Sequence, residues 1–299
     1  MKTRSLVSAL TVALVVVGAV ACSDSTAPGG TSPSASASFE AAVTQDLAPS
    51  AGEDIATDYS FMSGADMTSS GASFSVNAPG ATIIGVGVSP SVNTPPAGGS
   101  ATWISPSCVF NAGTGRFNCP PLTRGSQTYT TSYALFDING ATLSAYNKAT
   151  TASINFIVAD TGQTSFSANS NTFTDTTYRL HNRTVSTLLG DTVHTWNGSG
   201  TGSIHSTRTG QIRKVYTFSS VDTASAIRFR QPRDINPYPL GGTFAKNYTV
   251  VRTRAATDTT THTTTRQVLV TFNGTANVPM TINGVAYSLN LDTHKVTKQ

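Results

Sequence analysis

Apolar and polar residues alternate along most of the chain, and this pattern predicts β-strands. From residue 72 onward the period is two, and short runs are separated by Gly, Pro, Asn and Asp. The last hairpin is the clearest, because Val278 to Leu291 alternates on both sides of Asn283-Gly284, the strongest two-residue hairpin signal. We expect about 14 to 18 strands. The expected turns include Asp160-Thr161-Gly162 and Asn197-Gly198.

One segment, Phe39 to Met67, has helical spacing instead. An apolar stripe begins it, Pro49 interrupts the stripe, and a second run follows until Gly64. Because no helix separates the strands, a parallel sheet built from βαβ units is excluded. The sequence therefore predicts a single β-rich domain over residues 39–299. We expect an all-β antiparallel meander forming a curved sheet, half-barrel or sandwich, with the short helical segment at 39–67 covering part of it.

The first 21 residues predict export. Lys2 and Arg4 precede an uncharged apolar run from Leu6 to Ala21. A membrane-spanning helix needs about 20 apolar residues, so this run is slightly short, and the small residues at its end fit a cleaved signal peptide. Residues 1–21 are therefore assigned to a signal peptide. Residues 22–38, rich in Ser, Ala, Thr, Pro and Gly, are assigned to a flexible tether.

The end of the signal, Ala19-Val20-Ala21-Cys22, resembles a bacterial lipobox, although Ala19 stands where that family usually has Leu. The resemblance implies a diacylglyceryl group on the Cys22 thiol, cleavage just before Cys22, and acylation of the new amine with chains such as palmitate. Two or three chains hold a protein firmly at a membrane. Ser23 resembles the signal that sends enteric lipoproteins to the outer membrane. Ordinary cleavage at Ala19-Val20-Ala21 stays the alternative.

The other two cysteines, Cys108 and Cys119, flank a predicted hairpin that turns at Asn111, Gly113 and Gly115. The hairpin places them opposite each other, and in an oxidising compartment a disulfide is the default. The competing assignments are a metal pair and a redox-active dithiol. Neither is favoured, because there is no CxxC motif and no His nearby. The pairing leaves Cys22 as the unpaired cysteine, which lipidation explains.

Charge is scarce and unevenly distributed. Asp, Glu, Lys and Arg make up 11% of the residues, against about 25% in ordinary soluble domains. Cys22 to Gly115 holds seven acids and no Lys or Arg, whereas the chain from Arg116 onward is basic. We expect the acidic part to dock on the basic body or to be solvated. The alternative is that both are free for partners.

The sequence contains no recognisable catalytic, metal or cofactor motif, so none is assigned. The five histidines stand apart; His194 and His205 could face each other across the expected turn at 197–202, but two histidines without a nearby carboxylate make a poor metal site. Glu53 is the last glutamate, so a glycosidase pair in the β body would need two aspartates. Three of the aspartates, Asp137, Asp160 and Asp191, lie beside turn signals, where Asp is expected for local hydrogen bonds.

Basic residues give the one clustered candidate site. Neighbouring strands could align them into a stripe that meets anionic lipid headgroups or acidic glycans. The residues of this expected patch are Arg213, Lys214, Arg228, Arg230, Arg252 and Arg254. An ordinary solvated face, or a dock for the acidic segment, is the plainer alternative and the one we favour. Nucleic acid is not expected as a partner, because no aromatic stacking pattern surrounds these residues.

The mature chain also resembles uncharacterised, Thr-rich lipoproteins of Gram-negative bacteria through the hairpin Cys108-Val-Phe110 and Gly115-Arg-Phe-Asn-Cys119-Pro120. This resemblance carries no activity. We expect a non-enzymatic, outer-membrane-anchored lipoprotein that serves the cell envelope as a structural or ligand-binding module. One alternative is a periplasmic carrier of lipid or lipoprotein, with a cavity under a curved sheet. The other is a hydrolase of envelope glycans.

Overall fold

The computed structural model describes residues 35–63, 108–124, 126–168, 170–190, 192–210, 214–231, 237–254 and 261–299. The chain divides into two units, Met1–Phe39 and Glu40–Gln299, and the fold below is that of the second. In the described part, this unit holds fourteen strands and, from Glu40 onward, the single helix α1 (Ala35–Ser63). The strands are β1 (Val109–Asn111), β2 (Arg116–Asn118), β3 (Leu122–Arg124), β4 (Gln127–Phe136), β5 (Thr142–Leu143), β6 (Ser153–Ala168), β7 (Asn171–Ser186), β8 (Val193–Thr209), β9 (Lys214–Arg230), β10 (Gly241–Arg254), β11 (Thr261–Thr271), β12 (Asn277–Ile282), β13 (Val285–Asn290) and β14 (Val296–Lys298).

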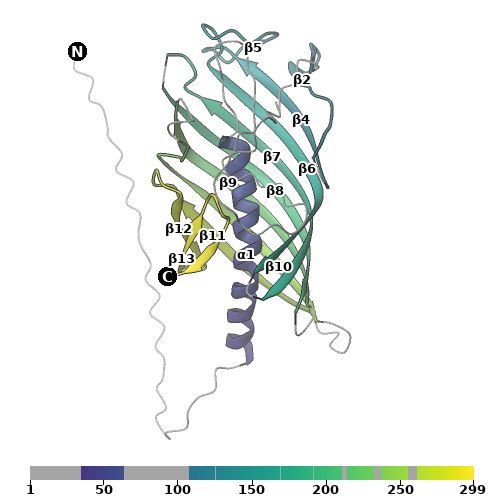
Figure 1. The fold of residues 1–299 in the computed structure, drawn as a ribbon. Coiled ribbons are helices and arrows are strands. Elements are labelled where there is room, and N and C mark those ends of the chain that lie inside the picture. Colours follow the sequence, from purple (N-terminus) through teal and green to yellow (C-terminus); the bar gives the residue numbers. More distant parts are fainter. Residues whose placement is uncertain are drawn as a thin grey trace, which may run out of the picture. The chain divides into compact units, whose positions relative to one another are not determined.

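All fourteen strands join one antiparallel sheet, and most pair with their neighbours in the chain (Figure 1). The order is β1-β2-β4-β6-β7-β8-β9-β10-β11-β12-β13-β14, with β3 and β5 also paired to β4. The sheet is curved and, in the part that the structure describes, its end strands β1 and β14 do not pair with each other. This confirms the predicted all-β class and curved antiparallel meander. The strands expected between residues 72 and 107 lie outside the described residues.

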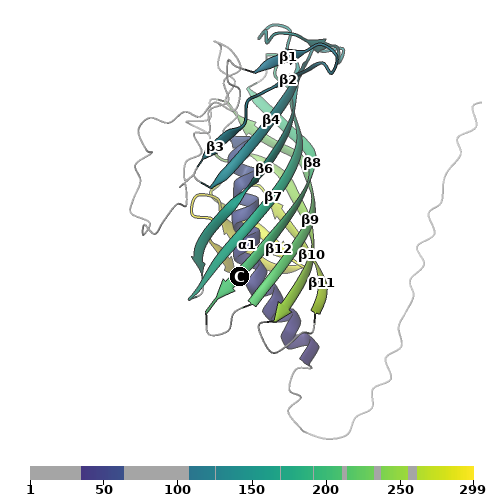
Figure 2. The ribbon, with the colours of Figure 1, turned by 90° about the vertical axis from the view of Figure 1, so that its right-hand side faces the viewer.

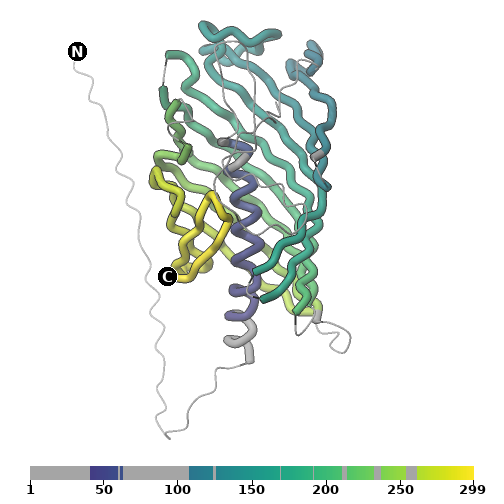
Figure 3. The backbone as a smooth tube through the Cα atoms, viewed as in Figure 1, coloured from purple at the N-terminus to yellow at the C-terminus, as the bar shows by residue number. Residues whose placement is uncertain are grey.

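Strands β6 to β9 are longer than their sequences suggest, and two of the expected turns are wrong. Asp160-Thr161-Gly162 lies in the middle of β6, and Asn197-Gly198 lies inside β8. Gly162 is needed for close packing, because a Cβ there would lie 2.6 Å from the Ser126 carbonyl oxygen. At 197–198 the ladder with β9 shifts register between Trp196 and Gly198, which marks a β-bulge instead of a turn. The long strands run side by side as continuous tubes in Figure 3.

Helix α1 lies along the concave face of the sheet, as Figures 1 and 2 show from two sides. It is one continuous helix from Ala35 to Ser63, so the expected interruption at Pro49 is wrong. Proline inside a helix costs about 3 kcal/mol. The residues around it, Leu47, Ala48, Ser50 and Ala51, are all buried, so packing against the sheet outweighs this cost. Within the described residues, the helix does not have the combination of length and hydropathy that a membrane crossing requires.

Aromatic side chains pack between the C-terminal part of α1 and the sheet. Phe61 of α1 meets Phe156 of β6 and Trp196 of β8 edge-on, with ring centroids 6.0 Å and 5.9 Å apart. Tyr59 stacks near Phe229 of β9 at 6.4 Å. Burying side chains of this size contributes about 1.5–3 kcal/mol each, so this group fixes one part of the helix on the sheet.

The first and last hairpins of the described sheet, β1–β2 and β12–β13, are held in different ways. Cys108 and Cys119 lie at disulfide distance beside the β1–β2 hairpin, with their Cα atoms 4.1 Å apart, as the sequence predicts. Asn283 and Gly284 join β12 to β13 with φ angles of 48° and 79°. Positive φ at both positions is the requirement of a type I′ turn, which explains why Asn-Gly stands there.

Candidate functional site

The face that α1 presents to the sheet is acidic along part of its length. Asp46, Ser50, Asp54 and Asp58 recur every four residues, so they share one side of the helix. Each is at most 5% exposed. Carboxylates that deeply buried require charged or hydrogen-bonding partners, because an unpaired buried charge is very costly. The sheet must therefore supply those partners.

Asp54 holds the first group of contacts. Arg179 Nε of β7 lies 2.5 Å from Asp54 Oδ1, and Lys246 Nζ of β10 lies 2.6 Å from Asp54 Oδ2. The Tyr248 hydroxyl donates a hydrogen bond to the same Oδ2 at 2.7 Å. Arg179 also pairs through Nη1 with Asp160 Oδ2 of β6, at 2.9 Å. A single helical carboxylate thus connects two long strands, and Arg179 extends the contact to a third.

Asp58, one helical turn later, holds the second group. His181 Nδ1 of β7 lies 2.9 Å from Asp58 Oδ1, and its Nε2 lies 3.6 Å from Asp160 Oδ1. Arg183 pairs with Asp222 of β9 and lies 3.8 Å from Asp58. We call the charged residues of both groups the buried ion cluster: Asp54, Asp58, Asp160, Arg179, His181, Arg183, Asp222 and Lys246.

Strand register explains why these residues meet. His181 of β7 is paired with Gly200 of β8, Gly200 with Asp222 of β9, and Asp222 with Lys246 of β10. The glycine in this row is needed for space, because a Cβ at Gly200 would lie 2.4 Å from Asp222 Oδ2. Without side chains at this position of β8, charged groups from β7 and β9 reach across it to each other and to α1.

The cluster is electrically balanced only when His181 carries a proton. It holds four carboxylates and three permanent cations, Arg179, Arg183 and Lys246. Burial alone would lower the pKa of His181, but the Asp58 and Asp160 carboxylates outweigh it and raise that pKa to about 9. Burial would likewise raise the pKa of Asp58, yet His181, Lys246 and Arg183 hold it well below its usual value.

Three residues of the cluster have the spacing of metal ligands. Asp58, His181 and Asp222 each offer an atom within 4.8 Å of the others, and Asp222 Oδ2 has no hydrogen-bond partner. With neutral His181, however, the cluster carries one excess negative charge, so one proton restores neutrality and a divalent cation would overshoot. Arg183 and Lys246 also stand where they would repel such an ion. The donor set therefore fits a proton better than a divalent metal.

A smaller ion group lies near the N-terminal part of α1. Asp46 pairs with Arg208 of β8 and with Lys214 of β9, whose Nζ lies 3.0 Å from Asp46 Oδ2. The Tyr216 hydroxyl donates to the same carboxylate. These contacts, with those of Asp54 and Asp58, confirm that the acidic segment docks on the basic body. The paired carboxylates and cations are therefore not free to bind a partner or a substrate.

The expected basic patch is not one surface. Lys214 belongs to the Asp46 group on the inner face, and Arg252, half-buried, is paired in register with inward-facing Tyr216. Arg228 and Arg230 are exposed on the outer face near the other end of β9, where Arg228 pairs in register with Gly241. The bulge at Ala226 and the length of β9 separate the two sets. Arg213 and the Arg254 side chain lie outside the described residues.

The outer face of the long strands has the opposite character. The outward positions take every second residue over Thr172–Ser186, Thr195–Thr209, Val215–Ser225, Thr243–Thr253 and Thr261–Thr271. At these positions, all in the described part of β7 to β11, no Asp, Glu, Lys or Arg occurs. Thr, Ser, Asn and Gln predominate, with a few apolar residues such as Tyr178, which is 47% exposed.

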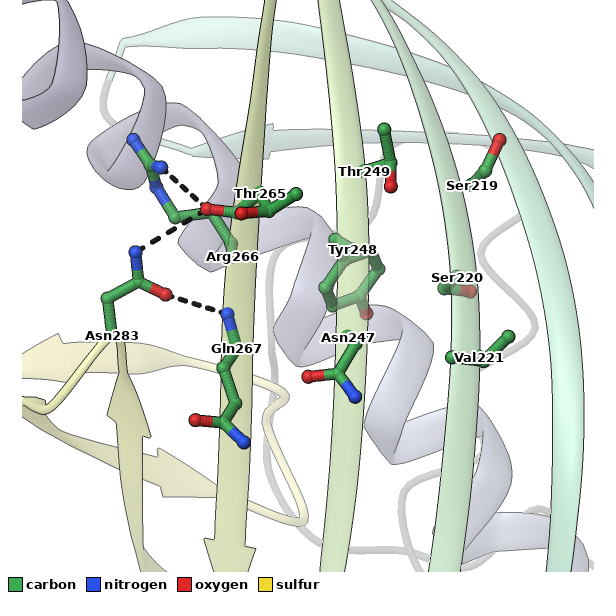
Figure 4. A pocket seen from close by; sticks show the side chains of 10 residues that line it. All are labelled: Ser219, Ser220, Val221, Asn247, Tyr248, Thr249, Thr265, Arg266, Gln267 and Asn283. Atoms are coloured by element: carbon green, nitrogen blue, oxygen red, sulfur yellow. Dashed lines mark hydrogen bonds between the residues drawn. The ribbon is translucent and has the colours of Figure 1, made fainter. Parts of the chain in front are cut away.

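A shallow depression of about 490 Å³ lies on this outer face between β9, β10, β11 and the β12–β13 turn (Figure 4). Its outward-facing lining is uncharged: Ser219, Val221, Asn247, Thr249, Thr265, Gln267 and Asn283. Asn283 accepts a hydrogen bond from the Gln267 backbone N–H at 2.7 Å, which ties the turn to the edge of β11. The depression is therefore a fixed and open feature whose outward lining is uncharged.

The remaining sequence candidates are placed as follows. Cys22 lies outside the described residues. His194 is buried on the inner face and His205 is exposed on the outer face, so the two do not face each other. The reason is that β8 is one continuous strand with a bulge, not two strands joined at residues 197–202.

The alternation of the sequence does not by itself single out Arg179, His181 and Arg183. They alternate with Tyr178, Leu180 and Asn182, and hydrophobicity alone would bury Tyr178 and Leu180. Two sequence patterns together could have found the cluster: basic residues at every second position of one strand, and acidic residues four or eight positions apart in the helical segment. Once buried, the basic residues need carboxylates as partners, and the carboxylates need cations.

Comparisons with known proteins add no assignment. No protein-family model matches the chain, and neither the curated proteins nor the solved structures give a match.

Proposed function

We propose that this chain is a lipoprotein of the cell envelope, held at the outer membrane through acyl chains on Cys22. Its folded body would be a non-enzymatic structural or ligand-binding module. The N-terminal sequence supports the anchor through its lipobox-like end and its charge-poor tether. The observation that carries the rest is the occupied concave face, where α1 and the buried ion cluster fill the centre of the sheet.

An occupied concave face bears on the carrier alternative. A lipid tail needs an apolar cavity, whereas the floor beneath α1 carries Arg179, His181 and Arg183 at its centre. Each of them contacts a carboxylate and is at most 4% exposed. Displacing α1 would remove Asp54 and Asp58 and leave only Asp160 and Asp222 of the cluster to balance its buried cations, so the geometry gives the carrier no specific support.

The same burial bears on the hydrolase alternative. A glycosidase places two carboxyl groups on either side of a substrate bond. The carboxylates that converge in the described residues, Asp54, Asp58, Asp160 and Asp222, are at most 4% exposed and pair with Arg, Lys or His. A glycan cannot reach them while α1 is docked. We therefore place the contact surface of the module on its outer face.

The anchor is tested by mass spectrometry of the mature N-terminus and by membrane fractionation. We expect an acylated Cys22 in the wild-type chain and release of Cys22→Ala from the membrane fraction, since two or more chains are needed to hold. Cys108→Ser is the matched control, because it removes a cysteine without touching the lipobox. An unmodified Cys22, or a Cys22→Ala chain that stays at the membrane, contradicts the proposal.

A further inference from the structure

We propose that the outer face binds a neutral, hydroxyl-rich glycan, and that the depression between β9, β10, β11 and the β12–β13 turn is the contact site. The inference rests on the proposed function, since it names the ligand class of the envelope module. It starts from the lack of Asp, Glu, Lys and Arg at the outward positions of Thr172–Ser186, Thr195–Thr209, Val215–Ser225, Thr243–Thr253 and Thr261–Thr271, whereas Arg228 and Arg230 lie beyond the bulge in β9. A charged partner would lose hydration on this surface and find no counter-charge, whereas a neutral glycan loses little.

The depression offers hydrogen-bonding groups in pairs. Asn247 of β10 and Gln267 of β11 are direct register partners, so their side chains start from neighbouring points on the same face. Figure 4 shows both side chains on the open side, and in the described residues neither amide group has a hydrogen-bond partner. Each amide carries a donor and an acceptor. This combination matches two adjacent sugar hydroxyls, each of which can also donate and accept.

An apolar contact lies beside the amides. Val221 of β9 pairs in register with Asn247, so Val221, Asn247 and Gln267 form one row across three strands. Val221 is 54% exposed. Sugar rings present C–H groups on their faces and hydroxyls at their edges, so a short apolar patch next to polar groups suits them. Ser219, Thr249 and Thr265 add hydroxyl groups to the lining.

The site is held rigidly from behind. Tyr248 and Arg266 alternate with the outward residues and point inward. Tyr248 donates a hydrogen bond to Asp54, and Arg266 Nε donates one to Thr44 Oγ1 at 3.0 Å. The depression thus lies on strands that are fastened to α1. A preorganised surface loses less conformational entropy on binding, which a weak neutral ligand requires.

The experiment titrates the full chain carrying Cys22→Ala with the neutral tetrasaccharides chitotetraose and maltotetraose and with an anionic oligogalacturonate. Calorimetry and amide NMR shifts follow binding. We expect at least one neutral probe to bind with a dissociation constant of about 1 mM or below, with shifts centred on β10 and β11. The anionic probe should bind at least about tenfold more weakly.

Variants locate the site. Asn247→Ala and Gln267→Glu should each weaken binding of the neutral probe about tenfold, through a lost amide in one case and a charge in the other. Thr176→Asp is the matched control: it adds a charge to the exposed outer face of β7, away from the depression, and should leave binding unchanged. Amide NMR spectra verify that each variant is folded.

Three results would overturn the inference: no neutral probe binding at about 10 mM, preference for the anionic probe, or equal loss in Thr176→Asp. Self-association that blocks the depression, seen as a concentration-dependent mass, would assign the face to a second copy instead. An unmodified Cys22 would remove the anchor but leave the glycan inference intact, and missing glycan binding would leave the anchor intact.

Discussion

The two faces of the long strands differ in where they place charge. On the inner face, β7 alone contributes Arg179, His181 and Arg183, and partners come from α1, β6, β9 and β10. On the outer face of β7 to β11, up to the bulge in β9, the alternate positions carry mostly hydroxyls and amides, with a few apolar residues such as Tyr178. In ordinary proteins the charged residues are mostly exposed and are almost never fully buried unless they are paired. Here a chain with few charges uses many of them to attach a helix.

This difference separates two tasks. Buried ion pairs contribute little net stability compared with apolar packing, but removing one member of a pair is strongly destabilising. The cluster therefore fixes the position and register of α1. Within the described residues, the outer face of the long strands has no comparable internal role, because its side chains point away from α1 and the inner core. We infer that folding constrains the inner face and that contact with other molecules is left to the outer one.

The largest expected effect comes from a substitution that removes one charge from the inner face. Arg179→Met should lower the free energy of unfolding by about 3–5 kcal/mol, because Asp54 and Asp160 are left buried with a missing partner. Urea denaturation measures the change. Arg228→Met, on the exposed outer face, should change it by no more than about 0.5 kcal/mol. Equal effects of the two substitutions would refute the division between the faces.

A smaller effect is expected from the protonation of His181. Its pKa is raised from 6.5 to about 9 in the folded chain, so the folded state holds the proton more tightly than the unfolded state. The resulting stability is fully present below about pH 6.5 and is lost as pH rises through about 9. We expect the free energy of unfolding to fall by about 2–3 kcal/mol across that window. Urea denaturation at each pH measures this change.

His181→Gln should remove most of this pH dependence, at a lower overall stability. His205→Gln, on the exposed outer face, should retain it. If the wild-type stability stays flat between pH 6.5 and 9, His181 does not carry the balancing proton of the cluster.

The sequence predicted much of the fold and little of the cluster, for reasons that particular residues make clear. Period-two alternation identified the sheet, and Asn283-Gly284 identified its last hairpin. Asp160 and Gly198 misled the turn assignment, because Asp and Gly have more than one structural use. Asp160 forms a buried ion pair, and Gly198 lies in a bulge where a Cβ would lie 2.1 Å from the Asn182 carbonyl oxygen.

The cluster itself depends on long-range register. Arg179 and Asp54 are separated by 125 positions, and local pattern does not reveal which strand will lie beneath α1. The docking of an acidic segment on a basic body followed from charge distribution alone, but its residues did not. The basic patch failed for the same reason: residues such as Lys214 and Arg228 share a strand but occupy opposite faces once the bulge at Ala226 is counted.

The smallest expected effects come from two neighbouring residues that point to opposite faces. Gly200→Ala should lower the free energy of unfolding by about 1–3 kcal/mol, because its Cβ would lie 2.4 Å from Asp222 Oδ2. Thr201→Lys, on the exposed side, should change it by no more than about 0.5 kcal/mol. Urea denaturation of both variants gives the contrast. A costly Thr201→Lys would mean that folding itself requires an uncharged outer face. If Thr201→Lys leaves the stability unchanged, folding does not explain the uncharged outer face. The lack of charge then points to a binding role, as contact with a neutral glycan would require.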